Sequence, residues 1–333
     1  MYTSFEGTTF DKIVTLLKSH HSEFVSGEKL GKMLSLSRTA IWKNIKKLQS
    51  LGYKIESKPK IGYRLHANTG LLLPWEITDG LQTDIIGKKI YYFDKIDSTQ
   101  NFALDLTQRP HENGSVVIAQ RQTQGRGRLD RRWISPKGGI WMSILLRPNF
   151  EPSYASLFPM ITSLALAVSI EEILKIKTEL KWPNDLTLKG KKVAGILIDA
   201  SIESNKIDYI VIGIGINFKI KPDTVTKSIK SNKRNYGIAT LIKKNQRVNP
   251  VELIQQFLFE LEQNYNKVVS DSTEQIRKEW VKRSSTIGKN ITATTTTGIL
   301  KGKALGIDKT GALLLSNRGK IQRLLAGDII YKN

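Results

Sequence analysis

Cysteine is absent from the 333 residues of the chain. Disulfide bonds, zinc–thiolate sites and cysteine nucleophiles are therefore excluded, and a reducing compartment is compatible with the composition. The chain has four histidines, and they are scattered rather than clustered: His20, His21, His66 and His111. We interpret them as structural or surface residues, so any chemistry that the protein performs must use other residue types.

Long apolar segments are also scarce. Residues 2–11 have neither a basic start nor an apolar core, so they predict no signal peptide. The longest mostly apolar run, residues 157–170, is interrupted by a proline and three hydroxyl-bearing residues, and it is shorter than the ~20 residues of a membrane-spanning helix. We expect a soluble, cytoplasmic protein with no membrane partner.

Acidic residues are few, because 30 Asp and Glu face 52 Lys and Arg, which gives a net charge of +22. Such an excess favours polyanionic partners or anionic ligands and does not specify a fold. A hydrophobic share of 40% is typical of a globular protein. The length allows two or three domains of ~100–200 residues each.

Five arginines are concentrated in residues 120–133, which read QRQTQGRGRLDRRW. Two glycines, Gly125 and Gly127, and a single acid, Asp130, accompany the arginines in this segment, which we call the arginine loop. Its five arginines are Arg121, Arg126, Arg128, Arg131 and Arg132. Glycines allow a close backbone approach and arginines supply planar charged donors, which suits a phosphate or carboxylate ligand. A solvated basic loop or a nucleic-acid contact fits this segment equally well.

The first 66 residues predict a winged helix-turn-helix. Apolar residues recur at helical spacing in residues 10–18, 26–34 and 38–50, and Ser26 and Ser37 are placed to cap the second and third helices. Alternating residues 53–65 then predict a hairpin wing. The alternative is a small helical domain with a solvated basic face. The residues predicted to contact DNA share an exposed basic face or the wing tip: Ser37, Arg38, Thr39, Lys43, Lys46, Lys47, Lys58 and Lys60.

Two short polar motifs follow in the central region. Asp97-Ser98-Thr99-Gln100-Asn101 comes after an expected strand, residues 89–96, and helix capping alone explains its hydroxyls. Lys181-Trp182-Pro183-Asn184-Asp185 combines a cation, an indole and an Asn-Asp pair, although a surface turn uses Pro-Asn-Asp readily. Neither motif identifies a site by itself.

Two nearly continuous apolar runs, residues 191–198 and 209–217, predict buried strands. Gly195, Gly213 and Gly215 mark points in them where another group approaches the backbone or where a helix packs closely. No dinucleotide-binding fingerprint and no Walker motif is present.

The remaining elements are regular. Helices are expected at residues 154–175, with Pro159 in or near the first turn, and at residues 251–268. Five short strands separated by glycine-bearing turns predict a small C-terminal β-barrel: residues 290–293, 298–307, 312–316, 320–325 and 328–331.

Taken in order, these motifs resemble the bifunctional biotin–protein ligases that also repress biotin genes, the BirA type. The matching features are Asp97-Ser98-Thr99, Gln122 with Gly125-Arg126-Gly127-Arg128 and Trp133, Lys181-Trp182-Pro183-Asn184-Asp185, Lys192 with Ala194-Gly195-Ile196-Leu197, and Gly213-Ile214-Gly215-Ile216-Asn217. The resemblance covers nearly the whole chain.

The resemblance implies an α+β protein in three parts. These are a winged helix-turn-helix in residues 1–66 with a linker in residues 67–80, a mixed α/β catalytic domain like class II aminoacyl-tRNA synthetases in residues 81–283, and a small β-barrel in residues 284–333. It also implies biotin and ATP as substrates, Mg²⁺, biotin carboxyl carrier protein as acceptor, operator DNA, and a homodimer when biotinyl-adenylate is bound.

Site residues are implied as well. Lys192, Arg126 and Arg128 would be catalytic. The biotin-binding set would be Ser98, Thr99, Gln100, Gln122, Gly125, Arg126, Gly127, Arg128, Lys192, Gly195 and Leu197. The set for ATP and the adenylate would be Arg128, Arg131, Trp133, Lys181, Asn184, Asp185 and Asn217, with Asp185 also binding Mg²⁺.

Two features depart from the family pattern. Asp130 stands where glycine is common, and Ala239-Thr240-Leu241 is one residue shorter than the usual segment, which leaves Trp133 and Tyr236 as candidates to stack on adenine. Two rival functions stay open: a ligand-sensing transcription factor that has lost ligase activity, and an acyl ligase for lipoate. Intact Lys192, Arg126 and Arg128 argue against the first, and the winged helix argues against the second.

Overall fold

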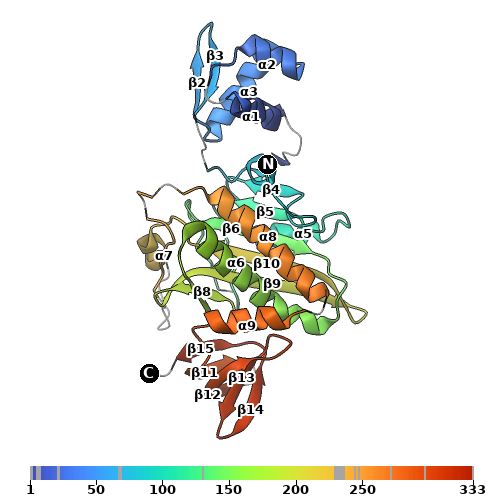
Figure 1. Ribbon diagram of the computed structural model, residues 1–333, viewed down its shortest axis with the longest axis vertical. Coiled ribbons are helices and arrows are strands. Elements are labelled where there is room, and N and C mark those ends of the chain that lie inside the picture. The colour runs from blue at the N-terminus through green and yellow to red at the C-terminus, as the bar shows by residue number, and fades with distance from the viewer. Residues whose placement is uncertain are drawn as a thin grey trace.

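The computed structural model describes residues 3–4, 9–20, 23–66, 70–129, 131–228, 237–243, 245–246, 248–270, 272–295 and 298–331. Three units follow one another along the long axis of the molecule (Figure 1). The N-terminal helices and hairpin lie at one end, a large sheet with its helices lies in the middle, and the C-terminal strands lie at the other end.

The N-terminal unit is the predicted winged helix-turn-helix. Its helices are α1 (Thr9–Ser19), α2 (Gly27–Leu34) and α3 (Arg38–Ser50), and its wing is β2 (Ile55–Lys58) paired with β3 (Gly62–Leu65). Ser26 and Ser37 cap α2 and α3, since each hydroxyl accepts a backbone N–H at 3.1 Å. Ile13, Ile41 and Ile45 are fully buried in the core of this unit.

The central unit is built on an eight-stranded sheet in the order β1-β4-β5-β6-β10-β9-β8-β7. Its strands are β1 (Thr3–Ser4), β4 (Ile90–Phe93), β5 (Val116–Ala119), β6 (Ile140–Leu146), β10 (Lys206–Ile216), β9 (Lys191–Glu203), β8 (Asp185–Leu188) and β7 (Glu179–Lys181). The pair β4–β5 is parallel and the other neighbouring pairs are antiparallel. The continuous apolar runs predicted to be buried strands form its centre.

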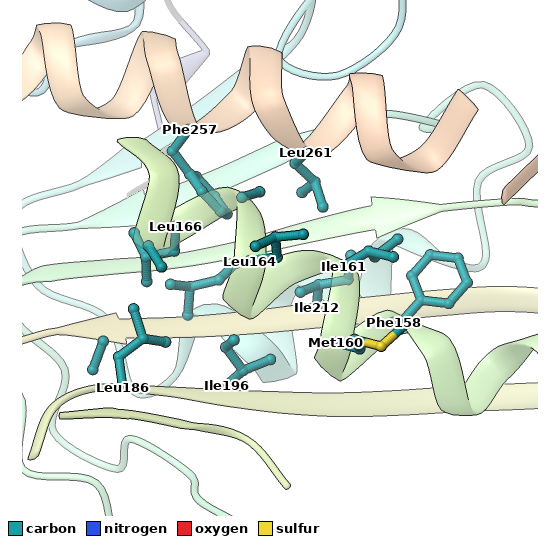
Figure 2. Packing of buried hydrophobic residues seen from close by; sticks show 14 of the residues in the cluster. Phe158, Met160, Ile161, Leu164, Leu166, Leu186, Ile196, Ile212, Phe257 and Leu261 are labelled. Carbon is teal, nitrogen blue, oxygen red and sulfur yellow. The ribbon is translucent and has the colours of Figure 1, made fainter. Parts of the chain in front are cut away.

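One face of the sheet is covered by α6 (Phe158–Leu174) and α8 (Pro250–Val269), whose apolar side chains interdigitate above Ile196 and Ile212 (Figure 2). Pro159 lies in the first turn of α6, as predicted, and a 3-10 helix, η1 (Pro152–Leu157), precedes it. By length and composition, residues 152–174 could cross a membrane, but 67% of the apolar window is buried. Its position between the sheet and α8 makes it a core helix.

The opposite face carries α5 (Thr99–Leu106), which packs on Val117, Leu145 and Val211. Because side chains alternate across a strand, these residues face away from α6 and α8. The α5 side also contains the polar residues of the predicted motifs. The site therefore lies on the face that the two long helices leave free.

Several elements were not predicted. They are α4 (Pro74–Thr78), α7 (Pro222–Ser228), α9 (Glu274–Arg283) and the strands β1, β7 and β8. The Lys181–Asp185 segment is a hairpin connection between β7 and β8, rather than an isolated surface turn. Strands of three or four residues, such as β7 and β8, are too short to show a period in sequence, which explains why they escaped prediction.

All five C-terminal strands are present as an antiparallel sheet ordered β14-β13-β12-β11-β15. The strands are β11 (Asn290–Thr295), β12 (Gly298–Ile307), β13 (Leu313–Asn317), β14 (Lys320–Leu324) and β15 (Asp328–Tyr331). The described pairings leave β14 and β15 as the two edges. The start of β15 faces the central unit, where Asp328 and Ile329 reach its cavity.

Candidate functional site

A cavity of about 790 Å³ lies where α5, the arginine loop and strands β8, β9 and β10 meet. Most residues predicted to bind biotin or nucleotide line it: Ser98, Thr99, Gln100, Gln122, Arg126, Gly127, Arg128, Arg131, Trp133, Lys181, Asn184, Asp185, Lys192, Gly195, Leu197 and Asn217. Gly125 is the predicted residue that does not line the cavity, and a Cβ there would lie 2.5 Å from the Trp133 carbonyl oxygen. The fold thus brings together predicted residues that are up to 119 positions apart, from Ser98 to Asn217.

A network of buried polar groups forms one wall of the cavity at the start of α5. The Gln122 side-chain carbonyl accepts hydrogen bonds from the Thr99 backbone N–H at 2.7 Å and from its hydroxyl at 3.1 Å. The Ser143 hydroxyl bonds to Thr99 Oγ1 at 2.9 Å and to Gln100 Oε1 at 3.0 Å. Ser98 caps α5, so capping accounts for that residue, but the other groups are fixed across three elements. We call this network the polar cradle.

The three glycines of the buried strands are approached by side chains of the site. A Cβ at Gly213 would lie 2.5 Å from Gln100 Oε1, which belongs to α5. A Cβ at Gly215 would lie 2.5 Å from the Trp133 indole, and one at Gly195 would lie 2.9 Å from the same ring. Both explanations offered for these glycines therefore apply. Gly213 allows the helix α5 to pack closely, and Gly195 and Gly215 allow Trp133 of the arginine loop to approach the backbone.

If Gln100 binds biotin, as the resemblance implies, Gly213→Ala should weaken biotin binding by at least about 10-fold, because the new methyl group displaces Gln100 from hydrogen bonds that are typically worth ~1 kcal/mol each. Isothermal titration with biotin measures this change. Gly306→Ala is the control, since no heavy atom lies within 4 Å of its added Cβ. Equal biotin affinities in the two variants would contradict the role of Gln100.

The arginine loop folds back onto the cavity through contacts with distant segments. Arg126 Nη1 lies 3.3 Å from both Asp199 Oδ2 and Asn101 Oδ1, and Arg128 Nη1 donates to Asn184 Oδ1 at 3.2 Å. Arg131 forms an ion pair with Asp328 of β15. Asp130, the predicted departure, lies outside the described residues, as does Tyr236. The loop is therefore held near its C-terminal end by the C-terminal sheet.

Lys192 lines the cavity beside a carboxylate and an indole. Its ammonium is 2.5 Å from Asp185 Oδ1 and 5.0 Å from the centroid of the Trp133 ring. The Trp133 Nε1 atom is buried and has no hydrogen-bond partner among the described residues. The Asn217 side-chain amide donates to the Lys192 backbone carbonyl at 3.3 Å, which fixes the strand that carries the lysine. A cation, a carboxylate and an aromatic face thus meet in one place.

Lys181 is the most buried cation of the cavity, with a side chain only 4% exposed. Burial lowers the pKa of its ammonium to about 8, and the charges of Lys192 and Lys289 act in the same direction, while Asp185 and Asp328 oppose them. Its Nζ lies 4.9 Å from the ring centroid of Tyr331 in β15. The desolvated ammonium favours an anionic ligand, which would stabilise its charged form.

The lowered pKa of Lys181 has a consequence for stability. Because the unfolded chain binds this proton more tightly than the folded chain, the lysine destabilises the fold below pH 8, and this cost disappears between about pH 8 and 10.5. The unfolding free energy of the ligand-free protein should therefore rise across that window relative to Lys181→Met. Denaturant titrations at pH 7, 8, 9 and 10 measure the difference. A pH-independent difference would contradict the assignment.

The carboxylates near the cavity determine whether it could hold a metal ion. Among the described residues, no group of three or more His, Asp or Glu side chains could hold a metal ion. Asp185 alone presents a carboxylate beside the cationic groups, while Asp328 is paired with Arg131. A single carboxylate cannot hold Mg²⁺ alone, but it fits an Mg²⁺ ion whose other ligands are phosphates and waters.

The predicted DNA-contacting residues lie on one exposed surface of the N-terminal unit. All eight are exposed: Ser37, Arg38, Thr39, Lys43, Lys46, Lys47, Lys58 and Lys60. Trp42 was not predicted, although it lies four positions after Arg38 and four before Lys46 and is 51% exposed. An exposed indole between two cations on a helix face is the signal that could have identified it.

Other site residues escaped prediction because they are isolated in sequence. Asp199, Asp328 and Tyr331 reach the site only through the fold. Ser143 is different, since a single polar residue within the apolar strand residues 140–146 could have been noticed.

Comparison with known proteins decides the family. Residues 92–217 match the Biotin/lipoate A/B protein ligase family, residues 11–64 match an HTH domain, and residues 286–331 match the Biotin protein ligase C terminal domain. The bifunctional ligase/repressor BirA of Bacillus subtilis is 35% identical over 320 residues, covering 95% of this chain and 97% of that protein. The chain belongs to the bifunctional biotin ligase/repressor family.

A second relative and a solved structure support the same family assignment. The bifunctional ligase/repressor BirA of Escherichia coli is 30% identical over 323 residues, which is 97% of this chain and 97% of that protein. The solved structure of the biotin protein ligase from Aquifex aeolicus in complex with biotin and ATP has a TM-score of 0.59 and 28% identity, covering 74% of this chain and 99% of that chain. The resemblance predicted from the motifs is confirmed.

Proposed function

We propose that the chain joins biotin to ATP, forms biotinyl-5′-AMP, and transfers biotin to a lysine of a biotin carboxyl carrier protein. The observation that carries the proposal is the cavity in which a polar cradle, Lys192 and the loop arginines converge on one volume. The cradle suits a ureido ring, which both donates and accepts hydrogen bonds. The cations suit a carboxylate and phosphates that must approach each other.

In the first step, a carboxylate oxygen of biotin attacks the α-phosphorus of ATP, and pyrophosphate leaves. In the second, the neutral amine of the acceptor lysine attacks the acyl carbon, AMP leaves, and the amine loses a proton. No protein nucleophile is required. Lys192, Arg126 and Arg128 would neutralise and orient the crowded anions, which is electrostatic and positional catalysis.

The other predicted residues would divide between the two halves of the ligand. The cradle, Gly195 and Leu197 would hold biotin, while Arg131, Trp133, Lys181, Asn184, Asp185 and Asn217 would hold the nucleotide. Mg²⁺ bound by the phosphates and Asp185 would neutralise charge on the triphosphate. Trp133 would provide the face for adenine, and its unpartnered Nε1 gives it a donor to use.

The repressor activity would use the N-terminal unit. Thr39 and Lys43 of α3 would face base edges, and the lysines of the wing would contact phosphates. The adenylate would act as corepressor and promote a homodimer that binds a two-part operator. The proposal includes a cytoplasmic location and the domain boundaries 1–66, 67–80, 81–283 and 284–333.

One assay tests the ligase claim. The protein is incubated with ATP, Mg²⁺, biotin and a biotin carboxyl carrier domain, and the acceptor is examined by mass spectrometry for a biotinyl group on lysine. Modified acceptor supports the proposal. An unmodified acceptor together with retained DNA binding would favour a ligand sensor without ligase activity, and modification by lipoate instead of biotin would favour the lipoate alternative.

A further inference from the structure

Tyr92 belongs to two units of the protein at once. It lies on β4, the strand next to the short edge strand β1 of the central sheet, yet its buried side chain packs in the apolar cluster of the N-terminal unit with Leu73 and Trp75. Its neighbours Tyr91 and Phe93 face the other side of the sheet, toward α5. The strand β1 pairs with the same edge, with Thr3 opposite Tyr92. The DNA-binding unit is therefore attached to the sheet at this residue.

The phenol of Tyr92 also contacts the arginine loop. Gln120 is the first residue of that loop, and its Nε2 donates to Tyr92 Oη at 2.6 Å. Two residues later, Gln122 accepts the Thr99 N–H within the polar cradle. A segment of three residues thus carries one side chain that bonds to Tyr92, a member of the core of the DNA-binding unit, and another that lines the ligand cavity.

On the DNA side, a buried carboxylate fixes the helices. Glu76 of α4 is 7% exposed and accepts hydrogen bonds from Tyr53 Oη at 2.5 Å and from Lys18 Nζ at 2.9 Å. Trp75 Nε1 donates to the same Tyr53 oxygen at 2.6 Å. Tyr53 follows α3, and Lys18 belongs to α1. A buried network with several partners favours one orientation, so α1 and α3 are held rigidly relative to α4.

We propose that the Gln120–Tyr92 hydrogen bond couples the arginine loop to the orientation of the DNA-binding unit, with Tyr92 as the positioning residue. The inference rests on the proposed ligand and DNA binding and deepens their regulation. A ligand that orders the loop would fix the position of the Gln120 side chain, and its hydrogen bond would then fix the Tyr92 ring. The rigid cluster of Tyr92, Trp75 and Tyr53 would in turn restrict the orientation of α3. Coupling of this kind is reciprocal, so DNA would tighten ligand binding by the same factor.

The measured quantity is the coupling factor, defined as the DNA affinity with biotin and ATP divided by the affinity without them. The probe is a DNA duplex selected from a random pool by the ligand-loaded wild-type protein. Sedimentation equilibrium on the same samples gives the dimerisation constant, so that affinities are compared at equal dimer concentration. Removing one neutral hydrogen bond of ~1 kcal/mol should lower the factor roughly 5-fold.

Tyr92→Phe is the test variant, because it keeps the ring in the cluster and removes the acceptor of Gln120. Tyr91→Phe is the matched control, since Tyr91 is a buried neighbour on the same strand whose hydroxyl donates to Glu112 at 2.7 Å. Gln120→Leu should reproduce the effect of Tyr92→Phe, and the double variant should show no additional loss. Acceptor biotinylation should be unchanged in all of them.

Equal coupling factors in wild type, Tyr92→Phe and Tyr91→Phe would overturn the inference, and so would additive losses in the double variant. A second readout needs no DNA. Because the chain lacks cysteine, Ser50→Cys and Lys206→Cys can be spin-labelled uniquely. Ligand should narrow the distance distribution between the labels in the wild type but not in the Tyr92→Phe background. Wild-type protein that binds no DNA would refute the repressor proposal, and this distance measurement would then decide the inference alone.

Discussion

Replacing Lys192 by glutamine should lower kcat/KM for adenylate formation by about 100- to 1,000-fold, which is the usual cost of removing one preorganised charge from an anionic transition state. The Lys192 ammonium lies 2.5 Å from Asp185 Oδ1 and 5.0 Å from the centroid of the Trp133 ring, which is where carboxylate, phosphate and adenine would meet. Pyrophosphate release in single-turnover experiments measures the effect.

The neighbouring lysine provides the control. Lys191 is exposed, whereas Lys192 points into the cavity, because successive side chains of a strand face opposite sides. Lys191→Gln removes the same charge from the same strand, and it should leave adenylate formation within about 2-fold of the wild type. Equal losses in the two variants would assign the effect to net charge rather than to the position of Lys192.

Replacing Lys43, Lys46 and Lys47 together by alanine should reduce DNA affinity by on the order of 100-fold at low salt. If each lysine contacts one phosphate, the slope of log affinity against log salt should become less steep by about three. Fluorescence anisotropy at several salt concentrations measures both quantities. Adenylate formation should not change, since these residues belong to α3, which lies in the N-terminal unit at one end of the molecule (Figure 1), and none of them lines the cavity.

A charge-matched variant distinguishes direct DNA contacts of these lysines from a general effect of the protein's net charge. Lys301, Lys303 and Lys320 are exposed lysines of the C-terminal sheet, and replacing all three lowers the net charge equally. This variant should retain most of its DNA affinity and the full salt slope. If both triple variants lose affinity to the same extent, the N-terminal surface is not the DNA-binding surface.

Helix boundaries followed closely from local sequence in the N-terminal unit. The predicted span of α3, residues 38–50, agrees with the structure, because Ser37 caps it and its apolar residues repeat at helical spacing. The predicted strand at residues 298–307 also agrees with β12, because turns that contain glycine mark the limits of the C-terminal strands. The short strands β7 and β8 and the helix α9 lacked such patterns, and they owe their structure to neighbours that are distant in the chain.

By itself, the sequence determined which residue types are available for chemistry and in what order they come: no cysteine, a loop of arginines, and motifs whose order indicates a biotin ligase joined to a DNA-binding unit. The tertiary structure alone decided the partners of those residues. Asp199 pairs with Arg126, Asp328 pairs with Arg131, and Tyr92 links Gln120 to the N-terminal core. Ion pairs and hydrogen bonds between residues so far apart in the chain depend on how sheets and units pack, and no local pattern encodes that.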